Sequence, residues 1–223
     1  MMKVLGINGS PRGERSATLR LIAAVLEGAK EGGAEIDLVN LIDLDIKFRN
    51  ACSACFREGR CAEEDDFPGL YEKIKAADGL VLGSPVYIDQ VTGQMKLLID
   101  RMADGIQCQT FSGKYGCSVS TSGDHAEQEV VKYLNHFLQM LGATPVGSVG
   151  VAIGKDPDIL TRSEEDARQL GRTLAEAIRT RRQYPEIEAF HERFRKKFEA
   201  VITGEKPEWP DDYERWVDLA WVW

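Results

Sequence analysis

The amino-acid sequence predicts an α/β fold organised around a parallel β-sheet of five strands. Two observations lead to this fold class. Short apolar segments alternate with segments of helical spacing five times between the N-terminus and about residue 180. Hydrophobic residues make up 43% of the 223 residues, which is enough for one sizeable core and a modest appendage. Strands that alternate with helices form a parallel sheet with helices on both faces.

Each strand and helix is placed by its own pattern of apolar residues. The expected strands are short runs of buried type and cover residues 3–8, 35–41, 79–83, 114–120 and 144–153. The expected helices carry apolar residues at helical spacing and cover residues 18–31, 68–77, 95–102, 130–141 and 167–178. Segment 44–67 follows neither period, so we expect a long loop inserted in a domain that spans residues 1–183.

The C-terminal residues 184–223 differ from the rest of the sequence. Apolar residues between Ile187 and Val201 recur at helical spacing, which predicts a helical extension of the domain. All four tryptophans of the chain follow this stripe. A segment this apolar is expected to cover its own domain or to pack on a second subunit, and a substrate lid or a membrane contact are the alternatives.

The net charge of −8 argues against a general binder of nucleic acid or of anionic membranes. The sequence shows neither a signal peptide nor an apolar run that would span a bilayer, so we expect a soluble protein of the cytoplasm. The five cysteines are an odd number, and Cys52, Cys55 and Cys61 are clustered. In a reducing compartment this clustering indicates a metal or redox function instead of a disulfide framework.

The loop after the first strand, GINGSPRGERSAT at residues 6–18, is rich in Gly, Ser, Thr and Arg. It leads into a helix, and a helix N-terminus offers unpaired N–H groups and the positive end of the helix dipole, which both suit a phosphate. Gly9 allows a close approach of the backbone, and Arg12 adds a charge-assisted hydrogen bond. The spacing matches neither the dinucleotide fingerprint nor the loop that binds nucleoside triphosphates.

The motif GSPRGERSAT resembles the FMN-phosphate loop of the flavodoxin-like NAD(P)H-dependent FMN reductases. The segment GSPVYIDQVTGQMKLLIDR at residues 83–101 is similar to the second motif of that family, in which Ser-Pro-x-Tyr precedes a Gly-x-x-Lys-x-x-x-Asp-Arg helix. The resemblance covers roughly residues 3–180. It implies a flavodoxin-like three-layer sandwich with strand order 2-1-3-4-5 and FMN at the switch between strands 1 and 3.

The resemblance also implies which residues bind FMN. The first loop would hold the phosphate, the loop after strand 3 would run along the isoalloxazine with backbone N–H groups near its N5 and O4 atoms, and the loop after strand 4 would complete the site. These residues are, in that order, Ser10, Arg12, Ser16, Ala17 and Thr18; Ser84, Pro85, Val86 and Tyr87; and Ser120, Thr121, Ser122 and Gly123. His125 comes directly after this loop and its neighbour Asp124. It either lies near the flavin or the nicotinamide, or it is a solvated residue at a helix start where Asp124 is a candidate N-cap.

The implied function is that of an FMN-dependent NAD(P)H oxidoreductase that passes electrons to a quinone, a flavin or another small acceptor. Such chemistry requires no catalytic side chain, because the cofactor reacts and the protein supplies stacking and orientation. A second subunit is expected to complete the face of the flavin, which implies a homodimer or a homotetramer. An electron-transfer protein that serves a protein partner and a non-catalytic redox or metal sensor are the alternatives.

The cysteine segment resembles the iron–sulfur flavoprotein branch of the same family, which carries Cys-x2-Cys-x2-Cys-x5-Cys and a four-iron cluster. Cys52, Cys55 and Cys61 match its last three cysteines, and Arg49 stands at the position of the first. Four thiolates are the usual requirement, so the sequence disfavours a cluster. Thiols without metal, a redox-active pair and a metal site remain open. Cys108 or Cys117 would be a distant substitute ligand, and Cys117 is expected to be a small core residue.

Overall fold

In a computed structural model the chain folds as a five-stranded parallel sheet with the strand order β2-β1-β3-β4-β5, which confirms the predicted fold class and topology. The structure describes residues 2–154, 156, 158–205, 207–219 and 221. The strands are β1 (Lys3–Asn8), β2 (Glu35–Asn40), β3 (Gly79–Pro85), β4 (Tyr115–Ser122) and β5 (Thr144–Ala152). Because β1 pairs with both β2 and β3, the loops after β1 and β3 leave the carboxyl edge of the sheet side by side.

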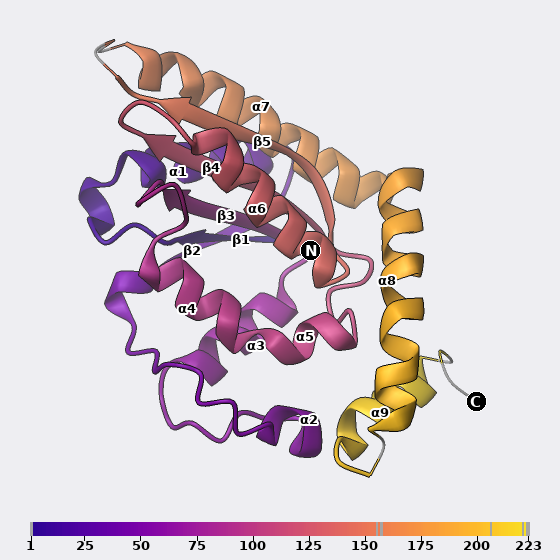
Figure 1. Ribbon diagram of the computed structural model, residues 1–223. Coiled ribbons are helices and arrows are strands. Elements are labelled where there is room, and N and C mark those ends of the chain that lie inside the picture. The colour runs from indigo at the N-terminus through magenta and orange to yellow at the C-terminus, as the bar shows by residue number, and fades with distance from the viewer. Residues whose placement is uncertain (1, 155, 157, 206, 220, 222–223) are drawn as a thin grey trace.

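Helices cover both faces of the sheet (Figure 1). One face packs on α1 (Ala17–Glu31) and α7 (Ile159–Thr180), and the other packs on α3 (Phe67–Ala76), α4 (Gly93–Arg101) and α6 (Glu127–Met140). Two single 3-10 turns, η1 (Gly13–Arg15) and η2 (Leu41–Asp43), follow β1 and β2. The result is a three-layer sandwich whose two apolar cores are separated by the sheet.

Helices α1 and α7 approach each other through glycines. A Cβ atom built on Gly171 would lie 1.9 Å from the carbonyl oxygen of Val25, and one built on Gly28 would lie 1.9 Å from that of Arg168. Neither position therefore accepts a side chain unless the two backbones move apart. This contact places the N-terminal half of α7 close to α1, whose first turn borders the candidate site described below.

The structure differs from the expected elements in the segments around the cysteines. Segment 44–67 contains a short helix, α2 (Ala54–Glu58), flanked by residues with left-handed backbone at Ser53 and Gly59. A second short helix, α5 (Ala103–Gln107), follows α4 almost directly. Both have only five residues, which is too short for a hydrophobic period to be visible in the sequence.

The C-terminal extension folds back on its own domain. It consists of α8 (Pro185–Gly204), which contacts α6, and α9 (Pro210–Asp218), which lies beside α2 at the lower edge of the molecule (Figure 1). Trp216 is fully buried against Cys108 and Ile202, and its indole N–H donates to the carbonyl of Gln107 at 3.1 Å. Trp209 packs on Phe56 of α2 with ring centroids 5.0 Å apart. Of the four tryptophans, Trp223 lies outside the described residues.

Candidate functional site

A cavity of about 270 Å³ opens at the carboxyl edge of the sheet, above the ends of β1, β3 and β4. The loops after these three strands form its walls, and the loop after β5 closes one side. Its lining residues are Ser10, Arg12, Ser16, Ala17, Thr18, Pro85, Val86, Tyr87, Thr121, Ser122, Gly123, Ile153 and Gly154. The structure thus brings residues of the three predicted loops to one place, as expected for a ligand site at the switch point of an open α/β sheet.

The first turn of α1 forms the anion-binding end of this cavity. Ser16 is the N-cap of the helix, and its hydroxyl oxygen accepts the N–H of Leu19 at 3.2 Å. The N–H groups of Ala17 and Thr18 stand in the first turn, where an α-helix provides no internal partner, and they are free to donate to a phosphate. The exposed guanidinium of Arg12 forms no ion pair with any residue that the structure describes, so its charge is also available to the ligand.

A buried hydrogen bond connects the two sides of the cavity. The hydroxyls of Thr18 and Thr121 lie 2.7 Å apart, and they join the first turn of α1 to the last part of β4. Thr18 has no exposed surface, so this contact is shielded from water. We infer that this bond holds the anion-binding turn at a set distance from the β4 loop.

The loop after β3 lies along the cavity, but its amides are used inside the protein. The N–H of Val86 donates to the carbonyl of Thr121, and the N–H of Tyr87 donates to the carbonyl of Gln90, both at 2.8 Å. The expectation that these two N–H groups face a flavin therefore does not match the structure. Tyr87 and Gln90 instead close a tight turn, whose inner residues Ile88 and Asp89 have left-handed φ angles of 49° and 59°.

Ser84 and Ser120 are absent from the cavity wall, in contrast to the expectation from the sequence. Successive side chains of a strand point to opposite faces of the sheet, and these two residues face the layer of α4 and α6. The hydroxyl of Ser84 accepts the N–H of Thr92 at 3.0 Å and so shapes the start of α4. The hydroxyl of Ser120 is buried without a hydrogen-bond partner among the described residues.

His125 links the two loops that border the cavity mouth. Its Nδ1 atom lies 2.6 Å from Asp124, and its Nε2 atom lies 2.9 Å from Asp89. The hydrogen bond with Asp124 and the charges of both carboxylates raise the pKa of His125, which favours the imidazolium form. The prediction that Asp124 caps the next helix is wrong, because α6 has Ala126 as N-cap without a side-chain hydrogen bond.

Sequence reasoning missed the contribution of the loop after β5. Ile153 and Gly154 line the cavity, and the N–H of Gly154 donates to the carbonyl of Gly123 at 2.7 Å. The only sequence signal was their position directly after a predicted strand, since the carboxyl ends of parallel strands share one edge.

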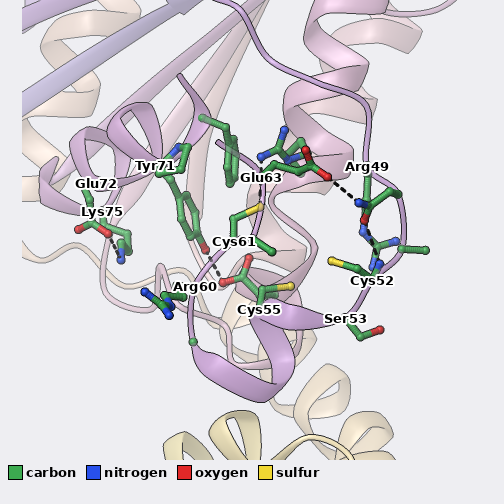
Figure 2. Close-up of a pocket in the computed structure, with 18 residues that line it drawn as sticks. Arg49, Cys52, Ser53, Cys55, Arg60, Cys61, Glu63, Tyr71, Glu72 and Lys75 are labelled. Carbon is green, nitrogen blue, oxygen red and sulfur yellow. Dashed lines mark hydrogen bonds and ion pairs between the residues drawn. The ribbon is translucent and has the colours of Figure 1, made fainter. Parts of the chain in front are cut away.

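The three clustered cysteines line a second cavity of about 240 Å³ (Figure 2), which shares no lining residue with the first. Its walls come from the segment 49–63, from α3, and from Arg101 and Asp104. Arg101 is buried and ties the segment together, because its guanidinium donates to Asp65, to the carbonyl of Lys47 at 2.8 Å and to the sulfur of Cys61 at 3.1 Å. Burial alone would raise the pKa of Asp65, but the hydrogen bonds that it accepts bring that pKa below its ordinary value.

Comparison with known proteins identifies the family of the chain. The model of the NADPH-dependent FMN reductases matches residues 2–158, so the protein belongs to this family and is a flavoprotein oxidoreductase with FMN as its cofactor. An iron-sulfur flavoprotein of Archaeoglobus fulgidus is 32% identical over 224 residues, which are 99% of this chain and 100% of the relative. An FMN-dependent NADH:quinone oxidoreductase of Delftia acidovorans is 26% identical over 184 residues, which are 70% of this chain and 87% of the relative.

Solved structures show the same fold. A flavone reductase superposes with a TM-score of 0.65 at 22% sequence identity, over 80% of this chain and 63% of that one.

The features of the first cavity fit FMN on physical grounds. The N-terminus of a 15-residue helix, an unpaired arginine and several hydroxyls suit a phosphate dianion, and Tyr87 supplies an aromatic ring farther along the same wall.

Proposed function

We propose that the protein is an FMN-dependent NAD(P)H oxidoreductase that passes electrons to a quinone, a free flavin or another small acceptor. The supporting observation is the first cavity, which combines a phosphate cradle at the start of α1 with a wall that runs from Pro85 to Tyr87. When bound, FMN would supply the redox chemistry, which is the transfer of two electrons from NAD(P)H to the acceptor. The reaction oxidises NAD(P)H and reduces the acceptor, and the protein need supply only binding and orientation.

In this proposal the residues of the chain have distinct roles. The N–H groups of Ala17 and Thr18, the hydroxyls of Ser10 and Ser16 and the guanidinium of Arg12 hold the phosphate. The wall residues from the loops after β3 and β4 border the isoalloxazine, and they are Pro85, Val86, Tyr87, Thr121, Ser122 and Gly123. The amides of Val86 and Tyr87 do not bind the flavin directly, because they hold the loop in shape.

The binding part of the proposal is tested with Arg12→Ala and with the matched control Arg15→Ala. Arg15 belongs to the same loop and is exposed, but it does not line the cavity. Loss of one charge-assisted hydrogen bond should weaken FMN binding by about tenfold or more in the first variant. Quenching of FMN fluorescence measures this affinity, and equal affinities of the two variants would contradict the proposed phosphate site.

The catalytic part of the proposal is tested by stopped-flow mixing of the holoprotein with NADH or NADPH. Rapid bleaching of the flavin absorbance by either nucleotide supports the enzyme. The alternative is an electron-transfer protein that exchanges electrons with a protein partner, and the similarity to iron-sulfur flavoproteins favours it. Absence of bleaching by both nucleotides, together with ready reduction by a ferredoxin, would establish this alternative.

We further propose that a second copy of the chain completes the face of the flavin. Ile88 is 96% exposed and Tyr87 is 46% exposed at the tip of the turn beside the cavity, which suits a subunit contact. A homodimer or homotetramer that dissociates on Ile88→Asp, measured by sedimentation, would support this assembly.

No helix in the described ranges is long and apolar enough to cross a bilayer. As a separate proposal, we place the protein in the cytoplasm.

A further inference from the structure

The cysteine cavity has one ligand too few for the cluster that gives its relatives their name. Cys52, Cys55 and Cys61 come from one segment and border the same cavity (Figure 2). A cluster of four irons is ordinarily held by four thiolates. In the part of the chain that the structure describes, no three or more Cys, His, Asp or Glu side chains form a group that could hold a metal ion.

The two remaining cysteines cannot complete the set without unfolding neighbouring structure. Cys117 lies in the middle of β4 with no exposed surface, packed in the core beneath α1 and α7. Cys108 follows α5 and packs on Ile202 and Trp216 of the C-terminal extension. Neither residue lines the cysteine cavity. Asp104, one of the carboxylates on its wall, already accepts the phenol hydroxyl of Tyr71 at 3.2 Å.

Two of the three thiols that line the cavity, those of Cys55 and Cys61, interact with cationic side chains. The sulfur of Cys61 accepts a hydrogen bond from Arg101, which two further groups hold in place. Arg49 lines the same cavity, and its positive charge acts on the thiol of Cys55. At the wall of the cavity Arg49 therefore presents a guanidinium, which is a cation and cannot replace a thiolate as a ligand for iron.

We propose that this chain does not assemble a four-iron cluster and that Arg49 is the residue that prevents it. The cavity is then lined by three thiols and by three guanidinium groups, those of Arg49, Arg60 and Arg101, and FMN is the redox cofactor of the protein. By the number of thiols, the segment is one ligand short of a cluster. A cysteine at position 49 would add a fourth thiol to the segment that carries the other three, which border one cavity.

The test compares three proteins after anaerobic reconstitution with ferrous iron and sulfide. These are the native chain, Arg49→Cys, and Arg49→Ser, which removes the same positive charge without adding a thiol. The measurements are iron and sulfide per chain, the broad absorbance near 400 nm, and the electron paramagnetic resonance spectrum after reduction with dithionite. We expect about four irons and four sulfides per chain in Arg49→Cys and background values in the other two.

Three results would overturn the proposal. A full complement of iron and sulfide in the native chain would show that three thiols suffice, and the same result in Arg49→Ser would show that only the charge matters. Background values in folded Arg49→Cys would show that position 49 is not the missing ligand. Folding is checked by FMN binding and far-ultraviolet circular dichroism, and the native-chain result stands even if the variant misfolds. Because FMN binds at the other cavity, failure here leaves the proposed reductase activity intact.

Discussion

Asp212 of α9 should make the attachment of the C-terminal extension depend on pH. Its side chain is fully buried, and neither carboxylate oxygen accepts a hydrogen bond from an N–H or O–H group of the described residues. Burial raises the pKa of Asp212 from 3.8 to about 7, and the negative charge of Asp104 adds to the effect, while Arg215 opposes it. The titratable and charged groups that interact with Asp212 are Arg215, Asp104, Asp211 and the thiols of Cys108 and Cys55. Tyr71 acts indirectly, because its hydroxyl is hydrogen-bonded to Asp104.

The sign of the effect follows from proton binding. Between pH 3.8 and about 7 the folded protein keeps a proton on Asp212 that the unfolded chain releases, so stability falls as the pH rises through this range and levels off above it. At about 1.4 kcal/mol for each pH unit, the full penalty is about 4 kcal/mol, and about 2 kcal/mol of it develops between about pH 5.5 and about pH 8.5. Asp212→Asn has no such proton to lose.

The assay is urea unfolding followed by tryptophan fluorescence at several pH values. All four tryptophans lie in residues 209–223, so the signal reports on the extension alone. As the pH rises over that range, the free energy of unfolding of the native protein should fall by about 2 kcal/mol relative to that of Asp212→Asn. Asp218→Asn, which removes an exposed carboxylate of the same helix, is the control and should run parallel to the native protein. The reasoning would be refuted if the free energy of unfolding of Asp212→Asn had the same pH dependence as that of the native protein.

Three further predictions concern other parts of the molecule. Arg101→Met should destabilise the fold by about 3–5 kcal/mol in urea unfolding, because it leaves the buried carboxylate of Asp65 without its cation; a change below about 1 kcal/mol would show that water replaces the guanidinium. Gly171→Ala should cost about 1–3 kcal/mol by forcing α1 and α7 apart, whereas Gly204→Ala, which meets no atom within 4 Å, serves as its control. In an NMR titration the pKa of His125 should lie above 6.5 and should fall more with Asp124→Asn than with Asp89→Asn, and the reverse order would contradict the stated cause.

The sheet was predictable because its signals are local and repeated. Apolar runs such as Gly79–Gly83 are bounded by loops of distinct composition, and a parallel sheet with covered faces requires little more than this alternation. The glycine contact between α1 and α7 was not predictable, since Gly28 and Gly171 are far apart in the sequence and look like weak points of their helices. Only the packed structure shows that each glycine admits a backbone oxygen of the other helix.

The candidate site could be located from the sequence, but the roles of single residues could not. Loops at the ends of β1, β3 and β4 must meet at one edge, whichever side chains they carry. The orientation of Ser84 and Ser120 depends on the register of two strands, and a shift of one residue moves a side chain to the other face. The use of the Val86 and Tyr87 amides inside the protein depends on a turn with left-handed residues, for which Ile88 and Asp89 give no sequence signal.

The extension and the cysteine cavity form one structural unit, although about 150 residues of sequence separate them. Arg215 of α9 donates to the carbonyl of Gly59 at 3.4 Å and lies 3.8 Å from Asp104, and both of these residues line the cavity. Gly59 has a left-handed backbone, and a Cβ atom there would lie 2.5 Å from Asp211, so α9 packs directly on the end of α2. One guanidinium therefore faces three carboxyl groups at this junction, and a proton on Asp212 reduces the imbalance. Arg215 therefore joins α9 to the end of α2, in addition to the contacts by which Arg101 holds the cysteine segment.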